Sequence, residues 1–167
     1  MNIMTINRKC DFINTGIWTQ KAIAEAEKIG TVHIAASSEN SAFSKIPDKS
    51  EFRFSEDADY LHICWNNTIY GTCYKEIPET GNTPLVADMS SSILSENIDV
   101  SRFGIIFAGA QKNIGPAGVT IVIINRNLYK RIPEKLPSML DFRIHSSARS
   151  LFNTPATYSI YMAGLVF

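Results

Sequence analysis

Six short apolar segments, separated by one helix-length stretch and by polar connections, constrain the fold of this chain more than any other feature. Each segment has the length of a β-strand and is bounded by turn-forming or polar residues. Strands that alternate with a helix or with loops indicate an α/β sheet. The predicted strands are Cys10–Asn14, Thr31–Ala36, Tyr60–Cys64, Leu85–Asp88, Gly104–Phe107 and Val119–Ile124.

One helix is predicted between the first two strands, at Trp18–Ile29, and Gly30 closes it. The segment Ser37–Glu56 is polar and contains a proline, so we expect a loop there. No internal repeat, low-complexity segment or Gly/Ser linker divides the chain, and residues 1–167 are therefore expected to form a single domain. The apolar stripe of the helix is expected to consist of Trp18, Ala22, Ala26 and Ile29.

Composition narrows the class of partner. The chain has 16 basic and 16 acidic side chains, 45% hydrophobic residues and no long charge block, a balance that points to neither nucleic acid nor a membrane surface. No apolar run reaches the ~20 residues of a membrane helix, and the N-terminus lacks the pattern of an export signal. Cys10, Cys64 and Cys73 have no Cys-x-x-Cys spacing, which favours reduced structural thiols. We expect a cytoplasmic protein.

Lys112 is the first candidate for chemistry. It lies within Ala108–Gly118, between glycines and small residues, directly after the predicted strand Gly104–Phe107 and before the strand Val119–Ile124. A tight turn between these strands leaves the lysine at the end of a sheet, where an amine can meet a cofactor. The alternative is a solvated loop lysine, because lysine is mostly exposed in proteins.

Asp88 is the second candidate. It ends the apolar strand Leu85–Asp88 and is followed by three serines, and the carboxyl end of such a strand faces the usual ligand crevice. A lysine amine that bonds to the cofactor and a carboxylate that pairs with its protonated ring nitrogen are the two groups that pyridoxal phosphate needs from a protein. The alternative for Asp88 is a helix N-cap or a turn residue.

These residues belong to a longer series of segments through which the chain resembles the phosphoserine aminotransferases, pyridoxal-phosphate enzymes of the class V aminotransferase group. The segments occur in the family's order and extend over the whole chain, so the resemblance is specific. They are Asn14–Trp18, Asn66–Ile69, Ala87–Ser91, Ile98–Gly104, Ala108–Gly118 and Phe152–Pro155.

The resemblance implies a fold and a reaction. The expected fold is the three-layer, mostly parallel α/β sheet of a fold-type I large domain, here incomplete. The implied reaction transfers an amino group between glutamate and 3-phosphohydroxypyruvate, giving O-phosphoserine and 2-oxoglutarate in serine biosynthesis, and pyridoxine biosynthesis uses a related substrate. Lys112 would bond to the cofactor and then act as general base and acid, while Asp88 would stay ionised against the pyridinium ring.

Three further residues gain a role from the resemblance. Trp18 would stack on the pyridine ring, although a tryptophan at a strand-to-helix junction can also be simple core. Thr68 would donate a hydrogen bond to the ring or phosphate, and its alternative is a turn or cap hydroxyl. Gln111 would donate to a phosphate oxygen, and its alternative is a solvated loop side chain.

Asn153 and Thr154 imply an assembly. In the family this pair is the contribution of one subunit to the cofactor phosphate in the other subunit's site, so the resemblance implies a homodimer. Both residue types are also good helix caps, and a helix is expected to begin near Pro155. His33, His62 and His145 have no set of partners that would make a metal site, and we expect structural or surface roles for them.

The chain departs from the family in extent. Family members have an N-terminal arm, a glycine-rich cofactor turn and a C-terminal domain, which are expected to carry the substrate-binding arginines, and the resemblance covers less than half of a member. Met1 resembles an internal methionine, and the apolar helix-like run Tyr158–Phe167 stops without a closing residue.

Two functions are compatible with this sequence: the catalytic segment of an aminotransferase, or a non-catalytic remnant or assembly partner. A desulfurase is disfavoured, because those enzymes place a histidine before the lysine.

Overall fold

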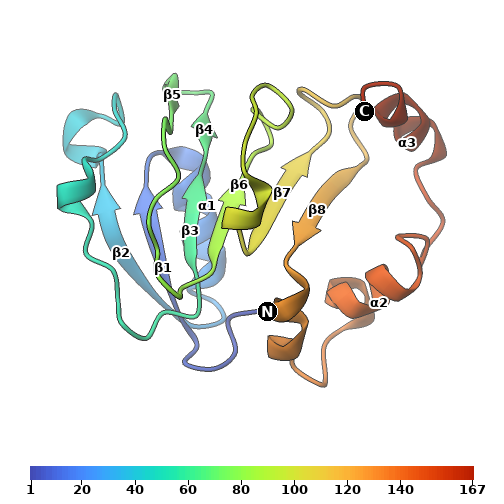
Figure 1. Cartoon of the computed structure of the whole chain (residues 1–167), viewed down its shortest axis with the longest axis horizontal. Helices are drawn as coiled ribbons and strands as arrows, with labels where there is room; N and C mark the ends of the chain where they lie inside the picture. The colour runs from blue at the N-terminus through green and yellow to red at the C-terminus, as the bar shows by residue number, and fades with distance from the viewer.

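The computed structural model describes residues 1–167 and contains one sheet of six strands (Figure 1). The strand order across the sheet is β2-β1-β3-β6-β7-β8, and a separate ribbon of two short strands, β4 and β5, lies at its upper edge. The strands of the sheet are β1 (Lys9–Asn14), β2 (Thr31–Ser37), β3 (Leu61–Cys64), β6 (Leu85–Asp88), β7 (Ile105–Gly109) and β8 (Thr120–Ile124); the ribbon consists of β4 (Asn66–Asn67) and β5 (Thr72–Cys73).

Five strands of the sheet run parallel, and β8 runs antiparallel to β7. The reversal follows from the short connection between β7 and β8, because a parallel return needs a crossover of about a dozen residues or more. All six predicted strands are present, with boundaries that differ by two residues or less. The predicted α/β class with a mostly parallel sheet is therefore confirmed.

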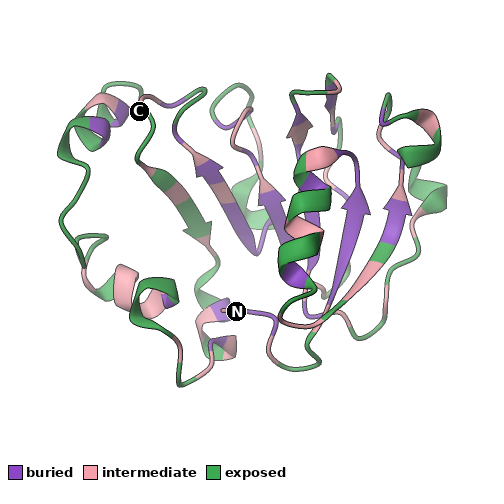
Figure 2. Ribbon diagram, turned by 180° about the vertical axis from the view of Figure 1, so that it is seen from behind, coloured by how far each residue is buried: buried purple, intermediate pink, exposed green.

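Helix α1 (Ile17–Ala26) connects β1 to β2 and packs against one face of the sheet (Figure 2). It ends three residues before the predicted end, because the backbone N–H groups of Ile29 and Gly30 turn back to the carbonyl of Ala26. The predicted apolar stripe is correct for Ala22 and Ala26, but not for Ile29, which lies beyond the end of the helix, nor for Trp18. Ala22, Ile23 and Ala26 pack with Phe12 of the sheet, whereas the Trp18 side chain is 39% exposed.

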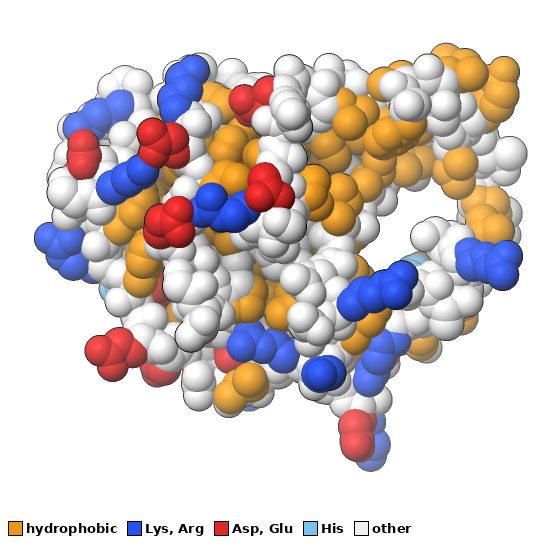
Figure 3. Space-filling view, viewed as in Figure 1, with side chains coloured by type: hydrophobic (Ala, Val, Ile, Leu, Met, Phe, Trp, Pro, Cys, Tyr) orange, Lys and Arg blue, Asp and Glu red, His pale blue; other side chains and the backbone are white.

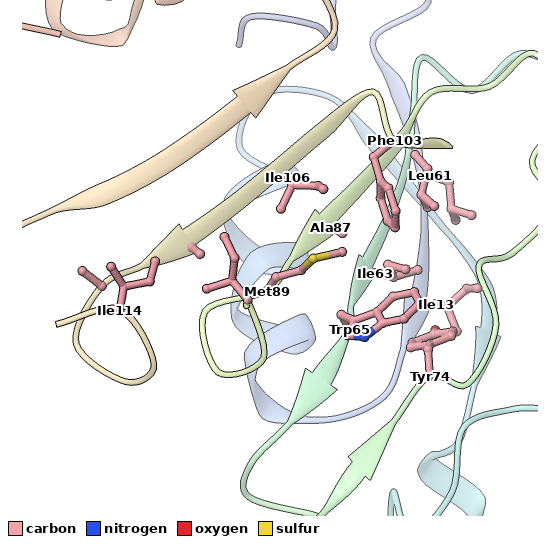
Figure 4. Packing of buried hydrophobic residues seen from close by; sticks show 14 of the residues in the cluster. Ile13, Leu61, Ile63, Trp65, Tyr74, Ala87, Met89, Phe103, Ile106 and Ile114 are labelled. Carbon is pink, nitrogen blue, oxygen red and sulfur yellow. The ribbon is translucent and has the colours of Figure 1, made fainter. Parts of the chain in front are cut away.

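The opposite face of the sheet carries the main hydrophobic core (Figure 4). Its residues alternate along β3, β6 and β7, because every second side chain of a strand points to the same face. Connecting segments cover this core, with Trp65 and Tyr74 stacked over it at 5.7 Å between ring centroids. The members labelled in Figure 4 are Ile13, Leu61, Ile63, Trp65, Tyr74, Ala87, Met89, Phe103, Ile106 and Ile114.

The β8 side of the molecule is covered least. Helices α2 (Phe142–Ser147) and α3 (Thr157–Gly164) lie beyond β8 in Figure 1, and Val122 and Ile123 of β8 are 38% and 39% exposed on opposite faces of the strand. Figure 3 shows hydrophobic side chains gathered on this side and charged side chains gathered over the β2 side. A cavity of about 230 Å³ lies here, lined mainly by apolar residues that include Ile106, Ile123 and Phe167.

Short 3-10 turns supply the remaining regular structure, and they were not predicted individually. They are Glu39–Ser41, Lys49–Glu51, Val100–Arg102, Arg126–Arg131 and Ser138–Leu140. The first two lie within the expected loop Ser37–Glu56. None of the helices has both the length and the apolar character needed to cross a membrane.

Candidate active site

The carboxyl ends of β1, β3, β6 and β7 meet at one edge of the sheet, and four predicted site residues lie at this edge. Trp18 is in the first turn of α1, which follows β1, and Thr68 follows β4. Asp88 is the last residue of β6, and Lys112 follows β7. The strand order changes direction between β1 and β3, and ligands of open α/β sheets bind at such a switch point.

Lys112 contacts two of the other predicted residues. Its Nζ donates a hydrogen bond to Thr68 Oγ1 at 3.1 Å and lies 5.7 Å from the centroid of the Trp18 ring. The Lys21 Nζ lies 4.9 Å from the same ring. A flat indole face at the open edge, next to an amine, can stack on an aromatic ligand. The alternative that Trp18 is simple core does not agree with its exposure.

The two oxygens of the Asp88 carboxylate have different partners. Oδ1 accepts hydrogen bonds from the Ser90 backbone N–H at 2.9 Å and from Ser90 Oγ at 2.6 Å. Oδ2 receives no hydrogen bond from the protein. Asp88 therefore acts as a turn residue through Oδ1. Its Oδ2 is available to a ligand.

Ser90 links Asp88 to the lysine loop. Its hydroxyl donates to Asp88 and accepts the backbone N–H of Gly109 at 3.1 Å. Beyond the lysine, Asn113 Nδ2 donates to the Ile93 carbonyl at 2.6 Å, and Ile114 is buried in the main core. These anchors hold the turn on both sides of Lys112, so that its amine is presented from a fixed backbone.

Two buried residues on β3 form the floor of the site. Burial raises the pKa of the Cys64 thiol to about 12; the negative charge of Asp88 acts in the same direction, and the positive charge of Lys112 opposes it. Burial lowers the pKa of His62 to about 4, and the charge of Asp88 opposes this change. Cys64 is thus a protonated thiol and His62 a neutral imidazole at neutral pH. His62 is buried and stacks on Phe12 of β1 at 4.6 Å between ring centroids, in keeping with the structural role expected for it.

A second set of residues fixes the junction between β1 and α1. Asn67 is completely buried, and its Nδ2 donates to the Thr15 carbonyl at 2.8 Å. Gly16 has φ +142°, and a side chain at this position would collide with Asn67 and Tyr70. The junction therefore joins Trp18 to the segment that carries Thr68. Both segments, Asn14–Trp18 and Asn66–Ile69, were noted for the family resemblance, but only Trp18 and Thr68 were assigned roles.

The remaining predicted site residues lie outside this cluster. Gln111 is exposed, and its amide folds back against Gly109. Asn153 and Thr154 are exposed in the segment between α2 and α3, where Asn153 Nδ2 donates to the Thr154 carbonyl at 3.3 Å. Neither caps a helix, because α3 has Ala156 at its N-cap position without a side-chain hydrogen bond. The structure does not bring this pair to Lys112 of the same chain.

An aspartate at the end of one parallel strand and a lysine in the turn after the neighbouring strand, with an indole and a hydroxyl at the same edge, define the kind of site that holds an aromatic, covalently bound cofactor in α/β enzymes. The family model described as aminotransferase class-V matches residues 4–167. The chain therefore belongs to the class-V aminotransferase family.

Several proteins with 34–50% identity to this chain are phosphoserine aminotransferases. A phosphoserine aminotransferase of Hahella chejuensis is 50% identical over 167 residues, which is 100% of this chain and 46% of that protein. A solved structure that records radiation damage of the Schiff base in phosphoserine aminotransferase is 49% identical, with a TM-score of 0.95 over 99% of this chain and 46% of the other. Pyridoxal-phosphate-bound phosphoserine aminotransferase from Trichomonas vaginalis is 34% identical, with a TM-score of 0.89 over 99% of this chain and 47% of the other. The chain spans about half the length of these relatives.

Proposed function

We propose that this chain supplies the cofactor-binding part of a phosphoserine aminotransferase, which transfers an amino group between glutamate and 3-phosphohydroxypyruvate to give O-phosphoserine and 2-oxoglutarate. The observation that carries the proposal is the Lys112 amine, held against Thr68 and Trp18 at the sheet edge that also carries Asp88. The identity of about 50% to phosphoserine aminotransferases supports the substrate assignment. Serine biosynthesis, and a related step of pyridoxine biosynthesis, are the pathways that this reaction serves.

The chemistry of the side chains fits pyridoxal phosphate. Lys112 offers an exposed primary amine, Asp88 an oxygen without a protein donor, Trp18 an exposed ring face and Thr68 a hydroxyl. We assign Gln111 to the cofactor phosphate on the family resemblance. When bound, pyridoxal phosphate supplies an aldehyde carbon that carries the amino group and a ring that accepts electrons.

Each residue then has a separate task. The Lys112 amine would hold the cofactor and would afterwards hold and move a proton at Nζ. Thr68 orients that amine through its hydroxyl oxygen. Trp18 covers one face of the bound ring and excludes water from it. Asp88 keeps a negative charge opposite the ring nitrogen, because a carboxylate stabilises a cationic partner within hydrogen-bond distance.

Asn153 and Thr154 support a homodimer as part of the proposal. Both are exposed and lie apart from the Lys112 cluster, so their assigned role requires a site on a neighbouring subunit. We propose that they contact the cofactor phosphate bound by the partner. The proposed location is the cytoplasm, where the metabolic substrates of such an enzyme are available.

Residues 1–167 are proposed to be one partial domain, the cofactor-binding part of a longer enzyme. The alternative is a non-catalytic remnant or assembly partner. One observation favours it for the isolated chain: β8 is apolar and exposed on both faces, as expected of a strand that another segment covers in a complete protein. Turnover of 3-phosphohydroxypyruvate and glutamate by this chain alone would exclude the alternative.

The first test is covalent capture of the cofactor. The chain is mixed with pyridoxal phosphate, its visible absorbance is recorded, and borohydride reduction is followed by mass mapping. We expect one attached cofactor on Lys112, and loss of both the band and the attachment in Lys112→Ala. The matched control is Lys135→Ala. It removes an exposed lysine that lies well after Lys112 in the sequence and outside the candidate site, and this variant is expected to behave as the unmodified chain. Equal labelling of Lys112→Ala would contradict the assignment.

A further inference from the structure

Thr68, which accepts the hydrogen bond from Lys112, lies in a hairpin that is too small to fix its own position. The strands β4 and β5 contain two residues each, and an isolated hairpin is at best marginally stable without packing against other elements. The Thr68 side chain is itself exposed. The position of its hydroxyl, 3.1 Å from the Lys112 Nζ, therefore depends on what anchors the hairpin.

The segment between the two strands is a closed turn. The Gly71 backbone N–H donates to the Asn67 carbonyl at 2.9 Å, and Gly71 has a φ of +68°, which favours glycine. The Ile69 backbone N–H donates to the side-chain oxygen of Asn67 at 3.3 Å. Because these bonds close the turn around Thr68, a residue that fixes one part of the turn also fixes the threonine.

Tyr70 is the one side chain between Asn67 and Gly71 that packs against the rest of the molecule. Thr68 and Ile69 are exposed, whereas Tyr70 is partly buried. One edge of its ring lies against the backbone of Gly16, where an added Cβ would come within 2.7 Å of the Tyr70 Cδ2 and Cε2. The ring also packs against Phe43, with 5.1 Å between the ring centroids and an interplanar angle of 53°.

Phe43 is held against Tyr70 by a strained backbone. Ala42 and Phe43 have φ values of +51° and +57°, a region that is unfavourable for residues with a side chain. The Ala42 N–H donates to the Glu39 carbonyl at 2.8 Å, and the Phe43 N–H donates to the Ser38 carbonyl at 3.0 Å. Strain persists where the surrounding structure fixes it. Here the Phe43 ring is buried and forms the surface on which Tyr70 rests.

Tyr70 thereby connects two parts of the candidate site. Gly16 precedes α1, which carries Trp18 two residues later, and Tyr70 lies two residues after Thr68. The Lys112 Nζ contacts both parts, because it donates to Thr68 and lies 5.7 Å from the centroid of the Trp18 ring. The contact between Tyr70 and Gly16 therefore helps to set the distance between the hydroxyl and the indole that the amine contacts.

We propose that Tyr70 is a positioning residue for Thr68: its ring, packed against Gly16 and Phe43, fixes the turn so that the Thr68 hydroxyl stays within hydrogen-bond distance of the Lys112 amine. The first part, the fixed turn, concerns the ligand-free chain. The second part rests on the proposed function, because it requires that the oriented amine serves the binding of pyridoxal phosphate.

The competing explanation is that Tyr70 only adds to the stability of the whole fold. Tyr70→Ala removes the ring, and Tyr70→Phe keeps the ring and loses the hydroxyl. Tyr129→Ala is the matched control, because Tyr129 is also partly buried and lies in the 3-10 turn Arg126–Arg131, outside the candidate site. Phe43→Ala is a second variant, which leaves Tyr70 in place and removes its partner.

The test in the ligand-free chain is amide hydrogen exchange measured by NMR. We expect the Gly71 N–H to exchange at least about 10-fold faster in Tyr70→Ala, because the turn opens locally while the amides of β3 and β6 keep their protection. Phe43→Ala should act in the same direction, and Tyr70→Phe and Tyr129→Ala should leave Gly71 unchanged. Unchanged exchange of Gly71 in Tyr70→Ala, or the same acceleration in the amides of β3 and β6, would overturn the proposal.

The second measurement is a double-mutant cycle with Thr68→Ala, in which affinity for pyridoxal phosphate is measured by equilibrium dialysis. We expect Tyr70→Ala and Thr68→Ala each to bind about 10-fold more weakly, a loss of the size that one hydrogen bond to a charged group produces. The double variant should bind no more weakly than the single variants, because both changes remove the same contact. Losses that multiply to about 100-fold would overturn the second part.

Two further results complete this measurement. Tyr70→Phe should bind as the unmodified chain does, because it keeps the ring that fixes the turn. Failure of the unmodified chain to bind pyridoxal phosphate would contradict the proposed function, and the exchange of the Gly71 N–H would still decide the role of Tyr70.

Discussion

At the residue scale, Asp88 divides its two carboxylate oxygens between local structure and the open edge of the sheet. Oδ1 closes the turn to Ser90, and Ser90 in turn holds the lysine loop through Gly109. The turn thus fixes the distance along the sheet edge between the carboxylate and Lys112. Asp88 can therefore serve the turn and a ligand at the same time. Its residue type alone does not choose between these two roles.

The charge state of His62 gives a prediction for stability. In the unfolded chain His62 takes up a proton as the pH falls below about 6.5, whereas in the folded chain burial delays this until about 4. The unfolded state therefore binds more protons in this window, and stability falls as the pH drops from 6.5 to 4. We expect His62 to contribute on the order of 1–3 kcal/mol to this loss.

Urea unfolding of the chain at pH 7 and at pH 4.5 measures the effect. His62→Phe should lose less stability between these pH values than the unmodified chain, because it has no proton to bind. His145→Phe is the matched control, since His145 is only partly buried. The same acid sensitivity in His62→Phe and in the unmodified chain would show that other groups account for it.

At the element scale, the junction between β1 and α1 determines where Trp18 lies. The buried Asn67 amide holds the end of β1 at the Thr15 carbonyl, and Gly16 then turns the chain into the helix with a backbone conformation that favours glycine. The predicted helix stripe grouped Trp18 with Ala22 and Ala26, whereas the family resemblance placed it on the cofactor ring. This turn rotates the first residues of the helix so that Trp18 faces Lys112.

Gly16→Ala tests this junction. The added methyl group would collide with Asn67 and Tyr70, and the backbone conformation is unfavourable for alanine, so we expect a loss of at least about 2 kcal/mol in the free energy of unfolding. Gly81→Ala is the control, because Gly81 also has a positive φ but open space around it, and should cost about 1 kcal/mol. Urea denaturation of both variants gives the comparison. Equal costs would mean that the junction tolerates the collision.

At the scale of the whole molecule, β8 is both an edge strand and an apolar one. Four consecutive residues from Ile121 to Ile124 are Ile or Val, a run typical of a strand buried on both faces. Here it carries exposed side chains on both faces and unpaired backbone groups on its outer edge, a combination that promotes association with other chains. Because the chain spans about half of its relatives, a larger protein has other segments that can cover this strand.

We expect the isolated chain to associate through β8 as its concentration rises. Val122→Lys places a charge on the exposed edge strand and should shift the mass measured by light scattering toward that of a single chain. Ile69→Lys is the control, since it charges an equally apolar and more exposed residue outside the sheet. A shift of the same size in both variants would indicate that general surface charge, rather than β8, controls association.

The sequence by itself determined the strands, the α/β class and the placement of Lys112 and Asp88 at strand ends. These features depend on runs of neighbouring residues, where hydrophobic patterning and turn chemistry act locally. Only the tertiary structure decided that Trp18 lies beside Lys112 and that the His62 ring stacks on Phe12. These contacts join residues far apart in the chain, so they exist only once strand order, register and the turn at Gly16 have brought the side chains together.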